Sequence, residues 1–285
     1  MKIIKSVIKK LFPGISYRLD EFKNLQKISI LQNVRAEIYN KNPNDILLKG
    51  FSVFSQVDED GIIEHIYNDV GEKSKVFVEI GCGNGLENNT HYLALKGWSG
   101  LWIDGSKANI DYIKSHIVDS QKKLLVEEFF VTPGNVLDFV SGKVNELDAP
   151  EKKVDFLSVD IDSCDYEITK ALLPLKPRVI CVEYNPDLRT KIDYYLTSDD
   201  STSWDKTIYQ GSSLLGYQKL LDEAGYSLVS CNVSGYNAFF VKKELLRDIK
   251  QQNIDQAYQP PREYLIGISH GHKKSFRWLQ KILSK

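Results

Sequence analysis

The pattern of apolar and polar positions changes twice along the chain. Over residues 20–39, apolar side chains recur every three or four positions, which predicts an amphipathic helix. Asn42, Pro43 and Asn44 follow, and this combination is expected to end the helix. The apolar stripe fits either packing on the core of the protein or contact with a second copy of the chain.

After Gly71, short apolar runs alternate with stretches of helical period. The predicted strands cover residues 76–80, 100–103, 129–131, 154–159, 179–183, 227–231 and 238–241. The predicted helices cover residues 88–96, 108–120, 166–173 and 212–224. Strands that alternate with helices are typical of an α/β fold, with a mostly parallel sheet and helices on both faces. We therefore expect a Rossmann-like, seven-stranded sheet.

The last two predicted strands are separated only by residues 232–235, which leaves no room for a helix. They are therefore expected to form a hairpin, with one antiparallel strand near the sheet edge. The chain is expected to consist of a helical extension over residues 1–50, the α/β domain over residues 51–245, and a helical and basic tail over residues 246–285. A length of 285 residues suits one sizeable domain with such extensions.

Charge and composition narrow the classes of partner. The net charge is −1, so no global basic field favours nucleic acid. No run of 18 apolar residues exists, so no membrane-spanning helix is expected. Residues 1–12, MKIIKSVIKKLF, are basic and apolar without a signal-peptide cleavage site, and they fit either an ordinary helix start or peripheral membrane contact. Four cysteines without paired spacing indicate free thiols and a cytoplasmic protein.

Three glycines, Gly81, Gly83 and Gly85, follow the first predicted strand at alternate positions. Glycine permits positive φ and close approach of a ligand to the backbone. Such a loop lies at the carboxyl end of a parallel sheet, where α/β folds bind ligands. Asp104 ends the next strand, 21 residues after Gly83, at a distance typical of an acid that accepts hydrogen bonds from ribose hydroxyls. A dinucleotide fingerprint would need glycine at position 86, where this chain has Leu86.

With an acid at position 79, this segment resembles the first motif of class I S-adenosylmethionine-dependent methyltransferases. The resemblance covers roughly residues 55–243 and implies that S-adenosylmethionine is the cofactor. In the family the adenine pocket follows the third strand, where residues 132–136 stand here. The resemblance therefore implies a set of cofactor-binding residues: Gln56, Glu79, Gly81, Gly83, Gly85, Asp104, Asn135 and Asp160.

Four shorter stretches narrow the resemblance. Residues 55–63, SQVDEDGII, and residues 97–101, GWSGL, resemble FkbM-like methyltransferases, although Val57 and Asp58 depart from that pattern. Residues 182–186 and 237–241 are similar to a bacterial subgroup linked to surface-polysaccharide genes. The resemblance implies O-methylation of a sugar, a surface-glycan precursor or a similar small metabolite. A nicotinamide-dependent oxidoreductase and a non-catalytic cofactor-binding assembly protein are the alternatives.

Carboxylates stand where the acceptor would need activation. Asp160 and Asp162 end the fourth predicted strand and Glu183 ends the fifth, so all three are expected at one rim of the sheet. A sugar hydroxyl needs a general base or a metal to react at neutral pH. The three carboxylates suit Mg²⁺, or Glu183 serves as a base without metal while Asp160 orients the acceptor.

Asp162 could instead cap the helix that follows it. In the tail, His270 and His272 titrate near neutral pH, and His272 is a further candidate base. The long polar stretch over residues 194–209 is expected to form part of the acceptor pocket.

Overall fold

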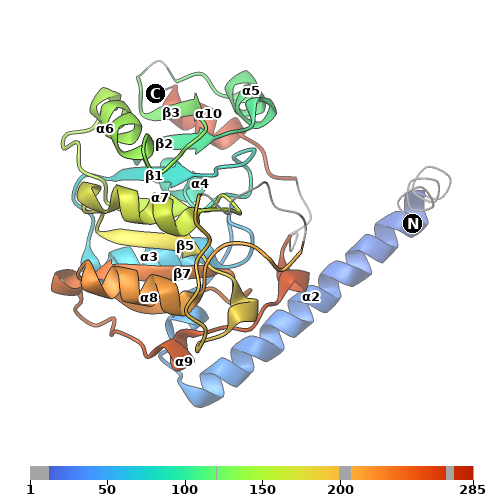
Figure 1. Ribbon diagram of the computed structural model, residues 1–285. Coiled ribbons are helices and arrows are strands. Elements are labelled where there is room, and N and C mark those ends of the chain that lie inside the picture. Colours follow the sequence, from blue (N-terminus) through green and yellow to red (C-terminus); the bar gives the residue numbers. More distant parts are fainter. Residues whose placement is uncertain (1–12, 120, 199–206, 268–272, 285) are drawn as a thin grey trace.

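The computed structural model describes residues 13–119, 121–198, 207–267 and 273–284. A seven-stranded sheet in the order β3-β2-β1-β4-β5-β7-β6 forms its centre (Figure 1). β7 pairs antiparallel with both of its neighbours, and the other pairs are parallel. The strands are β1 (Val76–Ile80), β2 (Ser99–Asp104), β3 (Leu124–Glu128), β4 (Phe156–Val159), β5 (Val179–Glu183), β6 (Tyr226–Cys231) and β7 (Asn237–Lys242). The predicted fold class, including the antiparallel hairpin, is confirmed.

Helices cover both faces of the sheet because alternate strand residues point to opposite sides. Phe77, Phe156 and Val179 face one apolar core, whereas Val78, Leu157 and Ile180 face the other. The first core is covered by α3 (Glu59–Val70), α4 (His91–Leu95), α5 (Lys107–His116) and α10 (Arg277–Leu283). The second is covered by α6 (Val136–Glu146), α7 (Asp165–Leu172), α8 (Leu214–Glu223) and α9 (Ile254–Ala257).

The structure differs from the sequence-based expectation in four elements. β3 lies at Leu124–Glu128, before the predicted residues 129–131, because its pairing with β2 starts at Leu124. Leu124, Leu125 and Val126 are as apolar as residues 129–131, so the pattern alone did not fix which segment pairs with β2. α3 and α6 were missed. α2 (Pro13–Lys41) starts earlier than predicted but ends just before Asn42, as expected.

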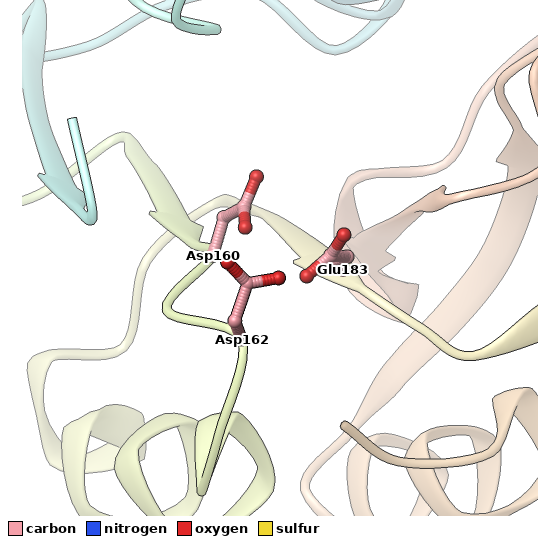
Figure 2. Close-up of side chains that lie close together, drawn as sticks. All are labelled: Asp160, Asp162 and Glu183. Carbon is pink, nitrogen blue, oxygen red and sulfur yellow. The ribbon is translucent and has the colours of Figure 1, made fainter. Parts of the chain in front are cut away.

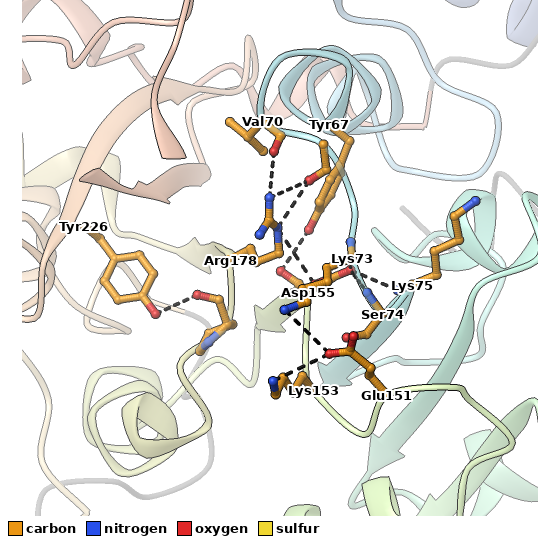
Figure 3. Close-up of polar contacts among 12 residues, drawn as sticks. Tyr67, Val70, Lys73, Ser74, Lys75, Glu151, Lys153, Asp155, Arg178 and Tyr226 are labelled. Carbon is orange, nitrogen blue, oxygen red and sulfur yellow. Dashed lines mark hydrogen bonds and ion pairs between the residues drawn. The ribbon is translucent and has the colours of Figure 1, made fainter. Parts of the chain in front are cut away.

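The amino edge of the sheet is sealed by a buried polar network (Figure 3). One oxygen of Asp155 accepts hydrogen bonds from the amides of Lys73, Ser74 and Lys75 at 2.8–2.9 Å. Arg178 lies 3.9 Å from the other oxygen and donates to the carbonyl oxygen of Val70 at 2.6 Å. These bonds fix the chain that enters β1 at the amino edge of the sheet. Ligands of α/β folds bind at the opposite edge, where the parallel strands end.

The extensions pack on this domain. α2 lays Leu31, Val34 and Ile38 against the first core, and its first turns extend past the body (Figure 1). From the described end of the chain, Leu279 and Leu283 of α10 are fully buried in the same core. Short 3-10 turns complete the fold: η1 (Ile46–Lys49), η2 (Leu173–Leu175), η3 (Pro186–Leu188), η4 (Lys243–Leu245) and η5 (Glu263–Leu265).

Two further observations bear on the sequence analysis. All four cysteines are buried free thiols. Within the described residues, no helix has the length and apolar character needed to span a bilayer.

Candidate cofactor and catalytic site

The glycine-rich loop leaves β1 with positive φ at all three glycines. A Cβ at Gly81 would lie 1.6 Å from the carbonyl oxygen of Asp160, so the loop and the end of β4 are in direct backbone contact. A Cβ at Gly83 would meet nothing within 4 Å, so the backbone there is open to a ligand. A Cβ at Gly85 would touch Phe276, which packs behind the loop. The three glycines therefore have different roles, and Gly83 faces the open side.

Asp104 connects the glycine loop to the start of α5. Its Oδ2 accepts a hydrogen bond from the Gly83 amide at 2.8 Å. Its Oδ1 accepts from the Ser106 amide at 2.7 Å and from Asn109 Nδ2 at 3.2 Å. A carboxylate oxygen can accept two bonds, so Oδ2 keeps capacity for a ligand hydroxyl beside Gly83.

Glu79 is buried and organises the segment before α4. Its carboxylate accepts hydrogen bonds from Asn88 Nδ2 and the Asn89 amide, each at 2.8 Å, and from the amide and hydroxyl of Thr90. Burial nevertheless raises the pKa of Glu79 to about 7. Glu79 therefore holds the wall of the site through Asn88 and Asn89.

A cavity of about 210 Å³ opens beside this wall. It brings together five of the residues expected to bind the cofactor: Gln56, Glu79, Gly81, Gly83 and Asp160. The other lining residues are Cys82, Asn84, Glu87, Asn88, Asn89 and Asn237. Gly85, Asp104 and Asn135 are not among them. The buried Asn88 Oδ1 has no hydrogen-bond partner within the described residues, so the cavity wall contains an acceptor available to a ligand donor.

The acidic stretch at the start of α3, residues 58–60, positions Gln56. Asp58 accepts from the Val233 amide, Glu59 accepts from Asn232 Nδ2 at 2.5 Å, and Asp60 Oδ2 accepts from the amides of residues 53–55. All three acids are buried, whereas Gln56 remains partly exposed and lines the cavity. The motif that resembled FkbM-like enzymes is therefore a framework that ties residues 53–57 to the β6–β7 turn.

The predicted carboxylate cluster is present, with Asp160, Asp162 and Glu183 pointing toward one another (Figure 2). One oxygen from each lies within 4.8 Å of the others. The loop that carries Asp162 is held by Asp165, whose carboxylate accepts hydrogen bonds from the amides of Ile161 at 2.7 Å and Ser163 at 2.8 Å. Asp165 itself begins α7, so Asp162 does not cap that helix in this structure.

The cluster has the electrostatics of carboxylates forced together. Burial and then the neighbouring acids Asp165 and Asp162 raise the pKa of Asp160 to about 7. Burial and then Asp160 raise the pKa of Glu183 well above its ordinary range. A shared proton or a bound cation relieves such repulsion. Carboxylate oxygens are the ligands that Mg²⁺ takes, and adjacent ligands of Mg²⁺ lie about 2.9 Å apart, so these three side chains would have to move closer to hold such an ion.

Asn135 was expected to bind the cofactor but does not line the cavity. Asn135 uses its side chain within its own loop: Oδ1 accepts from the Thr132 amide at 2.7 Å and Nδ2 donates to the Phe130 carbonyl oxygen at 3.2 Å. Phe130 is 80% exposed and lies beside Gly105, so it presents an aromatic face near Asp104. His272, like His270, lies outside the described residues, and its role stays a prediction.

Sequence reasoning singled out Glu79 but missed that it belongs to a row of polar residues across neighbouring strands. Glu79, Ser158 and Cys181 are register neighbours on β1, β4 and β5. Asn89 Nδ2 donates to Ser158 Oγ at 3.1 Å, and Asn237 Nδ2 donates to Glu59 at 3.2 Å. Polar residues at buried strand positions are the signal that could have revealed this row.

Comparisons with models of protein families and with curated proteins find no match for the chain. Among solved structures it is similar to a Staphylococcus aureus protein assigned as a caffeoyl-CoA O-methyltransferase, with 16% identity and a TM-score of 0.45 over 78% of this chain and 99% of that one. It is also similar to an O-methyltransferase from Bacillus cereus solved with SAH, with 15% identity and a TM-score of 0.39 over 84% and 95% of the two chains. At these identities, function has to be argued from the site itself.

Proposed function

We propose that the protein is an S-adenosylmethionine-dependent O-methyltransferase. The supporting observation is the backbone contact between Gly81 and Asp160, because it joins the glycine loop and the carboxylate cluster in one crevice. Methyl transfer needs this arrangement, since the acceptor oxygen must lie in line with the methyl group.

The residues of the crevice fit the parts of S-adenosylmethionine. Asp104 has capacity for a ribose hydroxyl, and Phe130 offers a face on which adenine could stack. The unpartnered Asn88 Oδ1 suits the ammonium of the amino-acid end. Leu86 disfavours the alternative of a nicotinamide oxidoreductase, whose fingerprint needs a glycine at that position.

The carboxylates would activate the acceptor. S-adenosylmethionine supplies an electrophilic methyl group on sulfur, and an oxygen–carbon bond forms as the carbon–sulfur bond breaks. Asp160 would orient the acceptor hydroxyl, and Glu183 in its ionised form would take the proton. A divalent ion held by Asp160, Asp162 and Glu183 would instead lower the pKa of that hydroxyl.

For the acceptor we propose a sugar or a surface-glycan precursor. Asn185, which follows β5, donates to the carbonyl oxygens of Ile208 and Gln210, so residues 207–210 lie beside the end of β5. Tyr209 is 54% exposed there, and Tyr195 is partly exposed and stacks on Tyr166 of α7 at 4.2 Å. Exposed aromatic faces next to a polar cluster suit a ligand with both apolar and hydroxyl surfaces.

Two experiments test this proposal. Calorimetry with S-adenosylmethionine and with NADH should give binding only for the first, and the reverse result would refute the cofactor. Labelled S-adenosylmethionine incubated with nucleotide sugars and glycan precursors, followed by mass analysis, should then identify the methylated acceptor.

A chelator experiment distinguishes metal from bare carboxylates. Turnover is measured after chelator treatment and removal, with and without added Mg²⁺. If Mg²⁺ restores turnover in the unmodified chain but not in Asp160→Asn, a metal-dependent reaction is supported. Equal turnover with and without Mg²⁺ would refute a role for the metal. Asp138→Asn, an exposed change on α6, is the matched control. Full activity in Asp160→Ala, Asp162→Ala and Glu183→Ala would refute the site.

A further inference from the structure

His91 is a buried polar side chain beside the glycine loop that the proposed reaction does not use. It begins α4 and is fully buried. Its Nδ1 lies 2.6 Å from the carbonyl oxygen of Gly85. Because a carbonyl oxygen can only accept a hydrogen bond, Nδ1 must carry the ring proton and act as the donor. His91 therefore ties the glycine loop to the start of α4.

The protonation state of His91 agrees with this assignment. Burial, more than the nearby charge of Lys274, lowers the pKa of His91 to about 4, so the ring is neutral near pH 7 and has a single N–H. With that proton on Nδ1, the buried Nε2 keeps a lone pair, and it has no hydrogen-bond partner among the described residues. An unpaired buried nitrogen is costly, and an apolar side chain would avoid it. The histidine therefore indicates a role for its N–H.

Aromatic rings fix the direction of this N–H. The imidazole stacks on Phe54 with ring centroids 3.5 Å apart and on Phe276 with ring centroids 5.5 Å apart. The tail supports this packing, because Lys274 Nζ donates to the carbonyl oxygens of Phe54 and Ser55 at 2.6 and 3.1 Å. The plane of the imidazole is thereby set, and Nδ1 stays directed at Gly85.

Gly85 closes the turn that faces the crevice. Its φ is +74°, and its amide donates to the Cys82 carbonyl oxygen at 3.0 Å. Gly83 lies inside this turn, with a backbone that is open to a ligand and an amide that donates to Asp104. Residues 82–84 line the cavity. A hydrogen bond to the Gly85 carbonyl oxygen therefore fixes the peptide that ends the turn.

We propose that His91 is a positioning residue for the cofactor: its Nδ1–H holds the Gly85 carbonyl oxygen and keeps residues 82–85 in the turn that offers the Gly83 backbone to S-adenosylmethionine. This role rests on the proposed function, because it takes S-adenosylmethionine as the ligand. His91 acts through the loop and does not touch the reacting atoms. Its loss should therefore weaken cofactor binding more than it lowers the turnover of the saturated enzyme.

Two substitutions of similar shape test the N–H. Asparagine and leucine both branch at Cγ, but only the amide of asparagine can donate to the Gly85 carbonyl oxygen. In calorimetry, His91→Asn should bind S-adenosylmethionine at least about fivefold more tightly than His91→Leu. In urea unfolding, His91→Asn should be no more stable than His91→Leu, since a buried amide leaves its own oxygen unpaired. Equal affinities, or an order of affinities that follows the order of stabilities, would overturn the proposal.

Tyr67→Phe is the matched control. The buried Tyr67 hydroxyl donates to the Asp155 carbonyl oxygen at 2.9 Å, at the amino edge of the sheet (Figure 3). Removing this donor should lower the stability and leave the affinity for S-adenosylmethionine unchanged. A loss of affinity in Tyr67→Phe as large as that in His91→Leu would count against a specific role of His91 and overturn the proposal.

Nitrogen-15 NMR of labelled histidine in the unmodified chain makes the test independent of how the variants fold. His91 should give the signals of the Nδ1–H tautomer, and S-adenosylmethionine should shift its Nδ1 resonance. The Nε2–H tautomer, or no response to S-adenosylmethionine in a chain that binds it, would overturn the role of His91 alone. If calorimetry shows that the unmodified chain does not bind S-adenosylmethionine, the proposed cofactor fails, and the role of His91 fails with it.

Discussion

Replacing Gly81 by alanine tests the contact that joins the two halves of the site. Gly81 has φ of +85°, and an added Cβ would lie 1.6 Å from the carbonyl oxygen of Asp160. Reaching even a tight contact of about 3 Å would need roughly 1.4 Å of movement. The obstacle is backbone at the end of β4, which cannot rotate away as a side chain could. The substitution should therefore push the glycine loop and the carboxylate cluster apart.

Gly97 provides the matched control for the cost of positive φ. Its φ is +82°, and an added Cβ would meet nothing within 4 Å. Gly97→Ala should cost only about 1–2 kcal/mol, the penalty of a left-handed backbone conformation. Gly81→Ala has the same conformational penalty and adds a steric conflict with Asp160. Overpacking of a filled site typically adds a further cost in stability of about 1–3 kcal/mol. The difference between the two variants isolates the contact with Asp160.

Urea unfolding of both variants gives the difference in stability, and calorimetry with S-adenosylmethionine gives the difference in affinity. Gly81→Ala should be less stable than Gly97→Ala by at least about 1 kcal/mol and should bind the cofactor more weakly. If the two variants unfold alike and Gly81→Ala binds S-adenosylmethionine like the unmodified chain, the loop and β4 are not in the contact described, and the reasoning fails.

Three further predictions concern the surroundings of the glycine loop. Asp104→Ala should weaken S-adenosylmethionine binding by about 1–3 kcal/mol, because the Gly83 amide and a ribose hydroxyl lose their acceptor; unchanged affinity by calorimetry in the folded variant would refute this. Phe276→Ala should lower the free energy of unfolding in urea by about 3–5 kcal/mol, because Phe276 is buried behind Gly85. Trp278 is exposed, so Trp278→Ala should cost little, and equal effects of the two changes would contradict the packing of Phe276. Burial raises the pKa of Glu79 from 4.5 to about 7. Between these two pH values the folded protein keeps a proton that the unfolded chain releases. Glu79 therefore lowers the free energy of unfolding as the pH rises from 4.5 to about 7. Glu79→Gln should reduce that slope by at most about 1.4 kcal/mol per pH unit in unfolding at several pH values, whereas the exposed Glu87→Gln should not.

The sequence by itself determined the backbone plan and the position of the crevice. The strand β1 and the three glycines after it could be located because alternation and glycine spacing are local signals. The meeting of Asp160, Asp162 and Glu183 could be predicted because neighbouring parallel strands end at one edge.

Only the tertiary structure decided which polar groups pair with which. Glu79, which was predicted to bind the cofactor, lines the cavity, and its carboxylate also holds Asn88 and Asn89. Asn237 comes from a distant strand, and Phe276 is placed behind Gly85 by the packing of α10. A local pattern specifies period and conformational freedom. The partner of a buried polar group is set by contacts between segments far apart in the chain, because such a group takes whichever donor or acceptor the packed core brings within reach.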